Sequence, residues 1–320
     1  SIDHSHAAKL RLYSEAPEFS LHNNRIELMR SSLISALKAS AETETILRPD
    51  TDWLQLDFKE IWRYRDLFVI LIWRDFAARY KQTMLGPLWF VIQPILTTLV
   101  FTVIFGYVAG LPTDGLPPLL FYLCGQLGWS YFAANFNSNS AIFVNNAGLF
   151  NKVYFPRLIV PLSAVVSNLF AFLIQAATFL VFFVYFKWFH GTSHFGMDWH
   201  IVFLPLVIFQ MAALSLGVGL LTSVITAKFR DLMQLSSLAI QLWMFATPVI
   251  LPLSKFPPKW QWMIALNPMT VIVESFRLML LGSGIVRPHY VLYSVALTIL
   301  TLAAGLIFFE KAEKSLIDAV

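Results

Sequence analysis

The spacing of its charged residues constrains this chain more than any other feature of the sequence. No Asp, Glu, Lys or Arg occurs between Lys81 and Asp114, Asp114 and Lys152, Arg157 and Lys187, Asp198 and Lys228, Asp231 and Lys255, or Arg287 and Glu310. A charged side chain near the centre of a bilayer costs about 2.5–3.5 kcal/mol, and a helix needs about 20 apolar residues to cross. The gaps therefore predict six membrane-spanning helices, at about 86–110, 118–141, 158–186, 201–227, 232–252 and 288–309.

The composition agrees with this prediction. Hydrophobic residues make up 57% of the 320 residues and charged residues only 13%, whereas charged residues are about 25% of an ordinary soluble domain. This excludes a soluble globule and a disordered chain. Cys124 is the only cysteine, which excludes a disulfide scaffold. The alternating pattern of an outer-membrane barrel is absent, so the sequence predicts an all-α integral membrane protein.

Basic residues that flank the predicted spans indicate which side faces the cytoplasm. They concentrate in residues 58–81, in the loops after the second and fourth spans, and in the predicted cytoplasmic tail, 311–320. The segment 253–287, on the opposite side, also carries four Lys or Arg, which weakens the pattern without reversing it. Both termini are therefore predicted to be cytoplasmic.

The first 57 residues differ from the rest of the chain. They hold six Lys or Arg and nine Asp or Glu, and they are predicted to be a cytoplasmic extension to which we assign no chemistry. Residues 58–82 follow, with a short apolar core, 67–73, between basic and aromatic ends. Such a segment is predicted to be an amphipathic helix in the membrane interface. It could be a simple anchor, or could also dock a cytoplasmic protein and anionic headgroups.

Residues 253–287 contain two apolar stretches, 260–269 and 271–281, each too short to cross a membrane. Pro268, Glu274 and Arg277 interrupt them. Both stretches are too apolar for an open loop, so they predict a short re-entrant helical hairpin that dips into the outer leaflet. Its backbone polar groups would be satisfied internally, and its charges would face protein or water.

Several functional motifs are missing from the sequence. There is no GxxxxGK[ST], HExxH or GxSxG motif and no paired Cys and His ligand set, so we expect neither a P-loop nucleotide site nor a metal site, and no catalytic residue. The predicted spans contain no Asp, Glu, Lys or Arg, whereas ion-driven carriers usually place an ionisable residue of this kind near the midplane. Energy for transport is therefore expected to come from another chain.

Aromatic side chains recur at helical spacing in the first two predicted spans. They are Phe90, Phe101, Phe105, Trp129, Phe132 and Phe136, and several Asn residues are close to the last three. Aromatic rings stack on sugar rings and amides supply hydrogen bonds, so this set is interpreted as the lining of a glycan channel. Lipid contact or helix packing is the alternative for each of these aromatics.

Two long runs carry a resemblance to a known family. Residues 65–106, RDLFVILIWRDFAARYKQTMLGPLWFVIQPILTTLVFTVIFG, resemble the permease subunit of type-2 ABC exporters for O-antigen and related cell-surface polysaccharides. The run 151–169, NKVYFPRLIVPLSAVVSNL, is similar to a cytoplasmic loop and third span of the same family. The resemblance covers residues 58–320. It implies a homodimer in the bacterial cytoplasmic membrane, paired with two ATPase subunits that hold ATP and Mg, and a glycan on undecaprenyl diphosphate as the substrate.

The resemblance also implies roles for particular residues. The contacts with the ATPase would be made by Arg74, Asp75, Arg79, Tyr80, Lys81, Asn151, Lys152 and Arg157. Leu85 and Gly86 would form the turn before the first span, near where the lipid-linked end enters, and Gly86 followed by Pro87 suits a sharp turn into a helix. Arg63 and Arg65 could bind the lipid diphosphate through charge-assisted hydrogen bonds, with phospholipid contact as the alternative.

Other functions remain open from the sequence. A type-2 ABC exporter of teichoic acid, small lipids or drugs would share the fold. A membrane glycosyltransferase or polymerase ranks last, because it would need clustered carboxylates or metal ligands. No nucleic-acid partner is expected.

Overall fold

The computed structural model describes residues 62–79, 81, 83–150, 155–189, 196 and 199–317. All of them belong to one compact unit, Leu54–Val320. Every regular element in this part of the chain is a helix, and no strand is present there. The predicted cytoplasmic extension lies outside the described residues.

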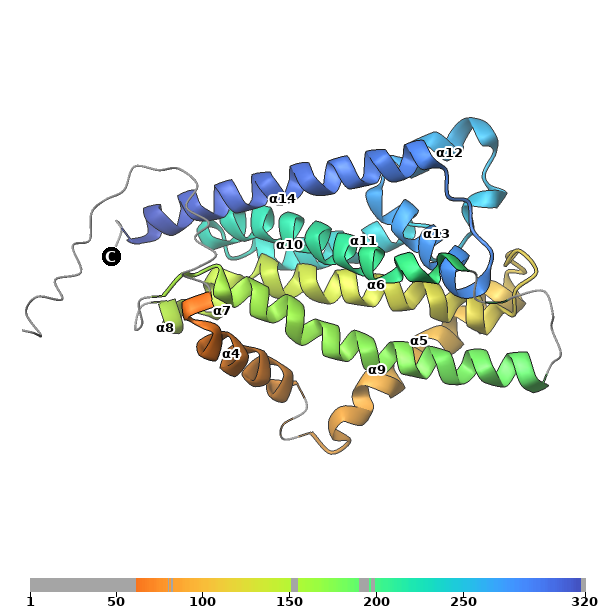
Figure 1. Ribbon diagram of the computed structural model, residues 1–320, viewed down its shortest axis with the longest axis horizontal. Helices are drawn as coiled ribbons and strands as arrows, with labels where there is room; N and C mark the ends of the chain where they lie inside the picture. The colour runs from red at the N-terminus through yellow and green to blue at the C-terminus, as the bar shows by residue number, and fades with distance from the viewer. Residues whose placement is uncertain are drawn as a thin grey trace, which may run out of the picture. The chain divides into compact units, whose positions relative to one another are not determined.

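Figure 1 shows how the helices of the described residues are arranged. Their bounds are α4 Arg65–Ala78, α5 Trp89–Phe101, α6 Pro118–Ser140, α7 Ile142–Asn145, α8 Ala147–Phe150, α9 Ile159–Phe189, α10 Leu204–Lys228, α11 Leu232–Phe245, α12 Pro258–Ala265, α13 Pro268–Leu281 and α14 Pro288–Ile317. Helix α5 is extended by a 3₁₀ turn, η1 (Gly86–Leu88), and by a π-helix, η2 (Thr102–Val108). Four helices begin at a proline, which lacks the N–H that a first turn would leave unpaired.

Four helical segments of the described chain are long and apolar enough to cross a membrane. They are Gly86–Val108, Ile159–Phe189, Trp199–Lys228 and Pro288–Glu313. They match the first, third, fourth and sixth predicted spans. The bent pair α12 and α13 could supply a fifth, if the two helices count as one broken span.

The six predicted spans are not all confirmed. Helix α6 has 23 residues, which is long enough to cross, but it carries uncharged polar side chains and is not among the strongly apolar segments. Helix α11 ends at Phe245, and Pro248 follows, so the range 232–252 is not one helix. The prediction relied on gaps between charges, and such gaps do not detect Asn, Gln, Ser or a proline turn.

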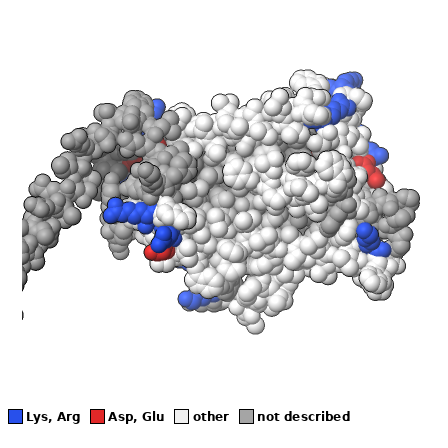
Figure 2. Space-filling view, in the orientation of Figure 1, with Lys and Arg blue, Asp and Glu red and all other residues white. Residues whose placement is uncertain are grey.

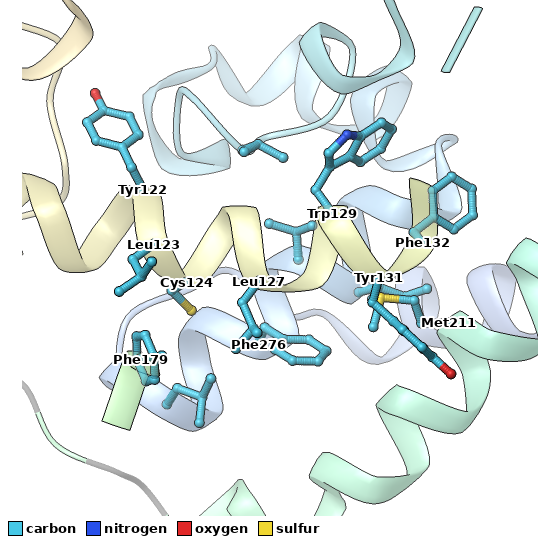
Figure 3. Packing of buried hydrophobic residues seen from close by; sticks show 14 of the residues in the cluster. Tyr122, Leu123, Cys124, Leu127, Trp129, Tyr131, Phe132, Phe179, Met211 and Phe276 are labelled. Carbon is cyan, nitrogen blue, oxygen red and sulfur yellow. The ribbon is translucent and has the colours of Figure 1, made fainter. Parts of the chain in front are cut away.

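Helix α6 lies at the centre of the bundle and packs against α5, α9, α10, α11 and α13. Its side chains form much of a large buried cluster, in which Leu127 lies beside Phe276 of α13 and Tyr131 lies near Met211 of α10 (Figure 3). Burial of most of its surface explains why a helix with several polar residues is stable here, since most of its polar groups, with Asn137 as an exposed exception, meet other helices rather than lipid.

Helices α10 and α14 make the closest contact between long helices. A Cβ on Gly217 would lie 2.7 Å from the Cα and backbone nitrogen of Leu302, and a Cβ on Gly305 would lie 2.6 Å from the carbonyl oxygen of Gly217. Only glycine permits this approach, because any side chain at these positions would collide with backbone.

The predicted interfacial segment forms helix α4, whose amphipathic character is not confirmed. Leu71 is buried and Phe68 is half-buried in a cluster with other helices, while Val69, Ile70 and Trp73 on other faces are more than 60% exposed. Apolar side chains thus occupy both the packed and the exposed sides. Contacts of α4 with α9 hold the packed side in place.

The predicted hairpin appears as two short helices, α12 and α13, between which the chain bends by 108°. Every residue of α13 except Leu278 is buried, because this helix packs on α6, α10 and α14. Whether the pair is re-entrant stays a prediction that follows from its length.

A buried ion pair connects α13 to its surroundings. Arg277 Nη1 lies 2.9 Å from Glu274 Oε1, and both side chains are 1% exposed. The guanidinium also lies 3.9 Å from the ring centroid of Phe121 and donates to the carbonyl of Val249 at 2.8 Å. The carboxylate accepts hydrogen bonds from the backbone N–H groups of two connecting segments, at Leu253 (3.2 Å) and Ile285 (2.9 Å). The predicted charges of the hairpin therefore face protein.

Candidate functional site

One end of the bundle carries Arg74, Asp75 and Arg157, three of the residues that the sequence assigns to an ATPase contact. A cluster of buried apolar side chains joins the helices there, with Leu71 from α4, Ile142 from α7, Phe150 from α8, Ile159 from α9 and Phe309 from α14. Figure 1 shows α4, α7 and α8 side by side at this end. We call it the α4 end.

Arg74 connects α4 to the turn between α7 and α8. Its Nη2 atom lies 2.7 Å from Asp75 Oδ1 and donates to Asn146 Oδ1 at 3.2 Å. The Arg74 side chain is 43% exposed, so it remains accessible to another protein. The structure thus brings two of the predicted contact residues, Arg74 and Asp75, beside a segment distant in sequence.

Arg157 connects the start of α9 to the last helix. Its Nε atom lies 3.8 Å from Glu313 Oε1, its Nη1 donates to the Glu313 carbonyl at 3.4 Å, and its guanidinium lies 5.4 Å from the ring of Phe150. The Arg157 side chain is only 14% exposed. Its main role in this structure is therefore to hold the start of α9 against α14, and little of it is accessible to another protein. Asn151 and Lys152, predicted beside it, lie outside the described residues.

The remaining basic residues near α4 differ in exposure. Arg63, Arg65 and Lys81 are exposed, and Arg65 lies 3.8 Å from Asp66. Burial lowers the pKa of the Arg79 guanidinium from its usual value, while the charge of Asp75 acts in the opposite direction. Tyr80 lies outside the described residues. The predicted diphosphate-binding role of Arg63 and Arg65 stays a prediction.

The predicted turn before the first apolar segment is confirmed. Gly86 has φ +52° and begins η1, with Pro87 at the next position and Leu85 exposed before it. Residues other than glycine rarely adopt this backbone conformation. The turn redirects the chain from α4 into α5.

The predicted aromatic lining divides into two groups. Phe90 of α5 stacks on Phe76 of α4, while Phe101 of α5 and Phe105 of η2 pack edge-on or tilted against Tyr122, and all three keep part of their surface exposed.

The three predicted residues of α6 are buried in the core. Trp129 is 4% exposed, Phe132 0% and Phe136 4%, and the Phe132 ring packs edge-on against Trp243. In this arrangement they pack against protein and cannot line a path on the surface of the chain, so the prediction is wrong for these three. Helical spacing identifies a face, but it does not tell whether that face points to a channel or to other helices.

A set of exposed uncharged polar side chains on α5 and α11 was not predicted from the sequence. Gln93 is exposed on α5, and Gln234, Ser237 and Gln241 are exposed at helical spacing on α11. An amide that faces lipid without a partner is costly, so these side chains are expected to face water, ligand or protein. The sequence did contain a signal for them, because Gln234 and Gln241 are seven residues apart and so lie on one face of a short apolar helix.

Charged side chains are confined to the two ends on the face shown in Figure 2, where an uncharged band separates them. At the end opposite α4, Asp114 binds Lys255 (3.6 Å) and Ser254 (2.7 Å). Among the described residues, no group of three or more His, Cys, Asp or Glu could hold a metal ion.

These features define a helical multi-pass membrane protein. Residues 66–281 match the profile of the family described as ABC-2 type transporter. The match spans more than half of the chain, and the chain belongs to this family.

Curated relatives cover most of the chain. It is 28% identical over 265 residues to an "O-antigen export system permease protein RfbA" of Myxococcus xanthus, which covers 82% of this chain and 98% of the relative. A protein of the same name from Klebsiella pneumoniae is 30% identical over 247 residues, 77% of this chain and 92% of the relative. A "Polysialic acid transport protein KpsM" of Escherichia coli is 24% identical over 252 residues, 78% and 94%.

Proposed function

We propose that this chain is the permease subunit of an ATP-driven exporter that moves a polysaccharide of the O-antigen type across the bacterial cytoplasmic membrane. The observation that carries the proposal is the similarity, over nearly the full length of the relatives, to two proteins named as O-antigen export permeases. Undecaprenyl diphosphate is the proposed lipid anchor of the glycan. The chain works as a homodimer with two copies of an ATPase subunit, which hold the ATP and Mg, and its termini are cytoplasmic.

The α4 end is the proposed docking surface for the ATPase. Arg74 is accessible and contacts the α7–α8 turn, while Arg157 ties the start of α9 to α14. A displacement of this surface by the ATPase would therefore be transmitted to several long helices, among them α9 and α14. The proposal also assigns to this surface Asp75 of α4, the residues Arg79, Tyr80 and Lys81 that follow α4 in the sequence, and the segment 151–157 with Asn151 and Lys152.

The exposed faces of α5 and α11 are the proposed glycan path. Both helices pack on α6 and leave large surfaces open. In a homodimer, the amides of Gln93, Gln234 and Gln241 would donate hydrogen bonds to sugar hydroxyls, and Phe90, Phe101 and Phe105 would add aromatic surface at the edge of the path. Arg63 and Arg65 would bind the diphosphate near the turn at Leu85 and Gly86.

A capsule-type polymer is the second candidate cargo, because one relative is named for polysialic acid transport. Teichoic acid, small lipids or drugs remain alternatives within the same family. ATPase stimulation by one of these compounds, and not by lipid-linked glycan, would favour them.

The test begins with purification of the tagged chain in mild detergent from cells that express its own operon. We expect a P-loop ATPase to co-purify, and its hydrolysis of ATP to rise when undecaprenyl-linked glycan is added. Purification without any ATPase would contradict the proposal.

A charge-reversal pair then tests the docking surface. Arg74→Glu should reduce co-purification of the ATPase and export together, because it reverses an accessible charge at the α4 end. The matched control is Lys259→Glu, an exposed cation at the opposite end of the bundle, which should change neither. Equal effects of the two variants would refute the docking assignment.

A further inference from the structure

The last long helix begins directly after a basic residue that the proposed function does not use. Arg287 is exposed, and the strongly apolar segment Pro288–Glu313 starts at the next position. A helix of this kind enters the bilayer where its apolar stretch begins. Arg287 therefore lies at the depth of the lipid headgroups, at the end of the bundle opposite α4 (Figure 1).

The carboxylates that the structure describes at this end pair with other basic residues. The ion pairs join Lys255 to Asp114 and Arg277 to Glu274. Among the described residues, no Asp or Glu pairs with Arg287, and residues 275–309 of the sequence contain no acidic residue. The positive charge of Arg287 is therefore available to an anion.

The guanidinium of Arg287 is held in place on two sides. Its Nη2 atom donates to Gln261 Oε1 of α12 at 3.4 Å, and the group lies 5.7 Å from the ring centroid of Tyr290. Gln261 is 5% exposed, and its amide nitrogen donates to the carbonyls of Leu253 and Phe256 at 3.4 and 3.1 Å. These bonds orient the Gln261 oxygen toward Arg287. A guanidinium carries five N–H donors, so most of them stay open to a ligand.

Aromatic side chains with a polar atom occur on the same two helices. Tyr290 and Tyr293 lie in the first turns of α14, where Tyr293 is 40% exposed, and Trp262 of α12 is 54% exposed beside Gln261. Tyrosine and tryptophan concentrate at the headgroup layer of membrane proteins. The surroundings of Arg287 thus combine an unpaired cation with side chains suited to lipid headgroups.

We infer that Arg287 binds the phosphate of an anionic phospholipid, with Gln261 as the residue that positions the guanidinium. A guanidinium binds phosphate through two parallel hydrogen bonds. The preference for an anionic lipid follows from charge, because residues 275–309 supply no carboxylate to pair with the ammonium group of phosphatidylcholine. The proposed orientation of the chain makes this a lipid of the outer leaflet.

The direct test places a fluorescent label near the site and compares two lipids. Leu292 is 73% exposed on α14 and the native Cys124 is buried, so Leu292→Cys takes up a bimane label alone. The labelled chain is reconstituted into bilayers of equal parts phosphatidylglycerol and phosphatidylcholine, with brominated acyl chains on one lipid or the other. Brominated chains quench the label on contact, so the two quenching values measure the local lipid composition.

We expect brominated phosphatidylglycerol to quench more strongly, with a local enrichment of roughly fivefold, the preference expected for one basic side chain at a membrane surface. Arg287→Gln should remove the enrichment. Arg287→Lys keeps the charge and should keep most of it.

Lys259→Gln is the matched control, because it removes another exposed cation at the same end. Lys259 and Gln261 are two residues apart on α12 and so point to opposite faces of the helix. The enrichment should therefore be unaltered in Lys259→Gln. Equal losses in Lys259→Gln and Arg287→Gln would mean that lipid is attracted to the whole end of the bundle, which would overturn the inference.

Two further outcomes would also overturn the inference. If inorganic phosphate abolishes the enrichment, the ligand of Arg287 is a free anion rather than a lipid. If neither brominated lipid quenches the label, another protein or a second copy of the chain covers this surface. Neither an ATPase nor export enters the measurement, so its outcome is independent of the test of the proposed function.

Discussion

At the scale of single residues, the stability of the fold is expected to be most sensitive to the loss of one member of the buried pair Glu274 and Arg277. Removal of two charges from water is costly, and the cost is offset only where each charge finds its partner and further hydrogen bonds. Both conditions are met here, since the carboxylate accepts two backbone N–H groups and the guanidinium has Val249 and Phe121 beside it. The loss of either charge would leave the other buried without a counter-ion.

We therefore expect Glu274→Gln to lower the free energy of unfolding by about 3–5 kcal/mol, because Arg277 would remain buried and charged without a counter-ion. The double variant Glu274→Leu with Arg277→Met should recover much of the loss, since no charge is then left unpaired. Thermal melting of the purified chain measures both. A single variant as stable as the unmodified chain would show that the pair is not buried as described.

Residue roles were predicted from the sequence with mixed success. The turn at Gly86 could be predicted from the sequence, because a glycine followed by a proline at this position favours a sharp turn into a helix. The burial of Trp129, Phe132 and Phe136 could not, since it depends on five neighbouring helices that approach α6 from distant parts of the chain. The exposed amides of α11 were not predicted, because the spans were located from gaps between charged residues, and such gaps do not reveal uncharged polar residues.

At the scale of elements, the contact of α10 with α14 depends on two glycines. Without a hydrophobic driving force in lipid, helix association relies on close packing, and small residues allow it. Gly217 and Gly305 bring the two backbones together in this way.

Gly217→Ala should separate the two helices and lower the free energy of unfolding by about 1–3 kcal/mol, the usual cost of overpacking. Gly148→Ala is the control, because a Cβ at that exposed position in α8 would meet nothing within 4 Å. Thermal melting of the two variants should differ clearly. Similar curves would mean that the α10–α14 contact is looser than described.

A second prediction at this scale concerns the amides of α11. Gln241→Leu should slow export roughly fivefold if the lost hydrogen bond to the glycan is worth about 1 kcal/mol, while the melting temperature stays unchanged because the side chain is exposed. Transport of labelled glycan into inverted vesicles measures the rate. Val181→Ala, on the exposed surface of α9, should leave it unaltered, and an unaltered rate in Gln241→Leu would remove α11 from the path.

The elements themselves were predicted in part. The four strongly apolar segments were found because length and lack of charge suffice for them. The true extent of α11 and the polar character of α6 were missed, since a charge gap records neither a proline nor buried amides. The bent pair α12 and α13 was found from Pro268 and from the shortness of its apolar stretches.

At the scale of the whole molecule, the proposed homodimer makes a prediction about which helices meet. Cys124 is the only cysteine of the sequence and is buried, so a new surface cysteine would react alone. Leu96→Cys on α5 and Leu238→Cys on α11, both exposed, should give oxidised dimers.

Leu300→Cys, exposed on α14, is the control and should remain monomeric. Denaturing gels without reductant give the answer. Dimers from the α14 position alone would place the homodimer interface at α14. They would contradict the proposal that the glycan path runs along α5 and α11.

The pairing of Glu274 with Arg277 has an electrical consequence for the whole molecule. The membrane potential does work of about 2.3 kcal/mol per 100 mV on each elementary charge that crosses the bilayer. The two side chains carry opposite signs 2.9 Å apart, and the strongly apolar cores of the other helices carry no charge. Rearrangement of this bundle therefore moves almost no net charge of its own, so a voltage imposed on vesicles should neither drive nor oppose the protein's own conformational cycle.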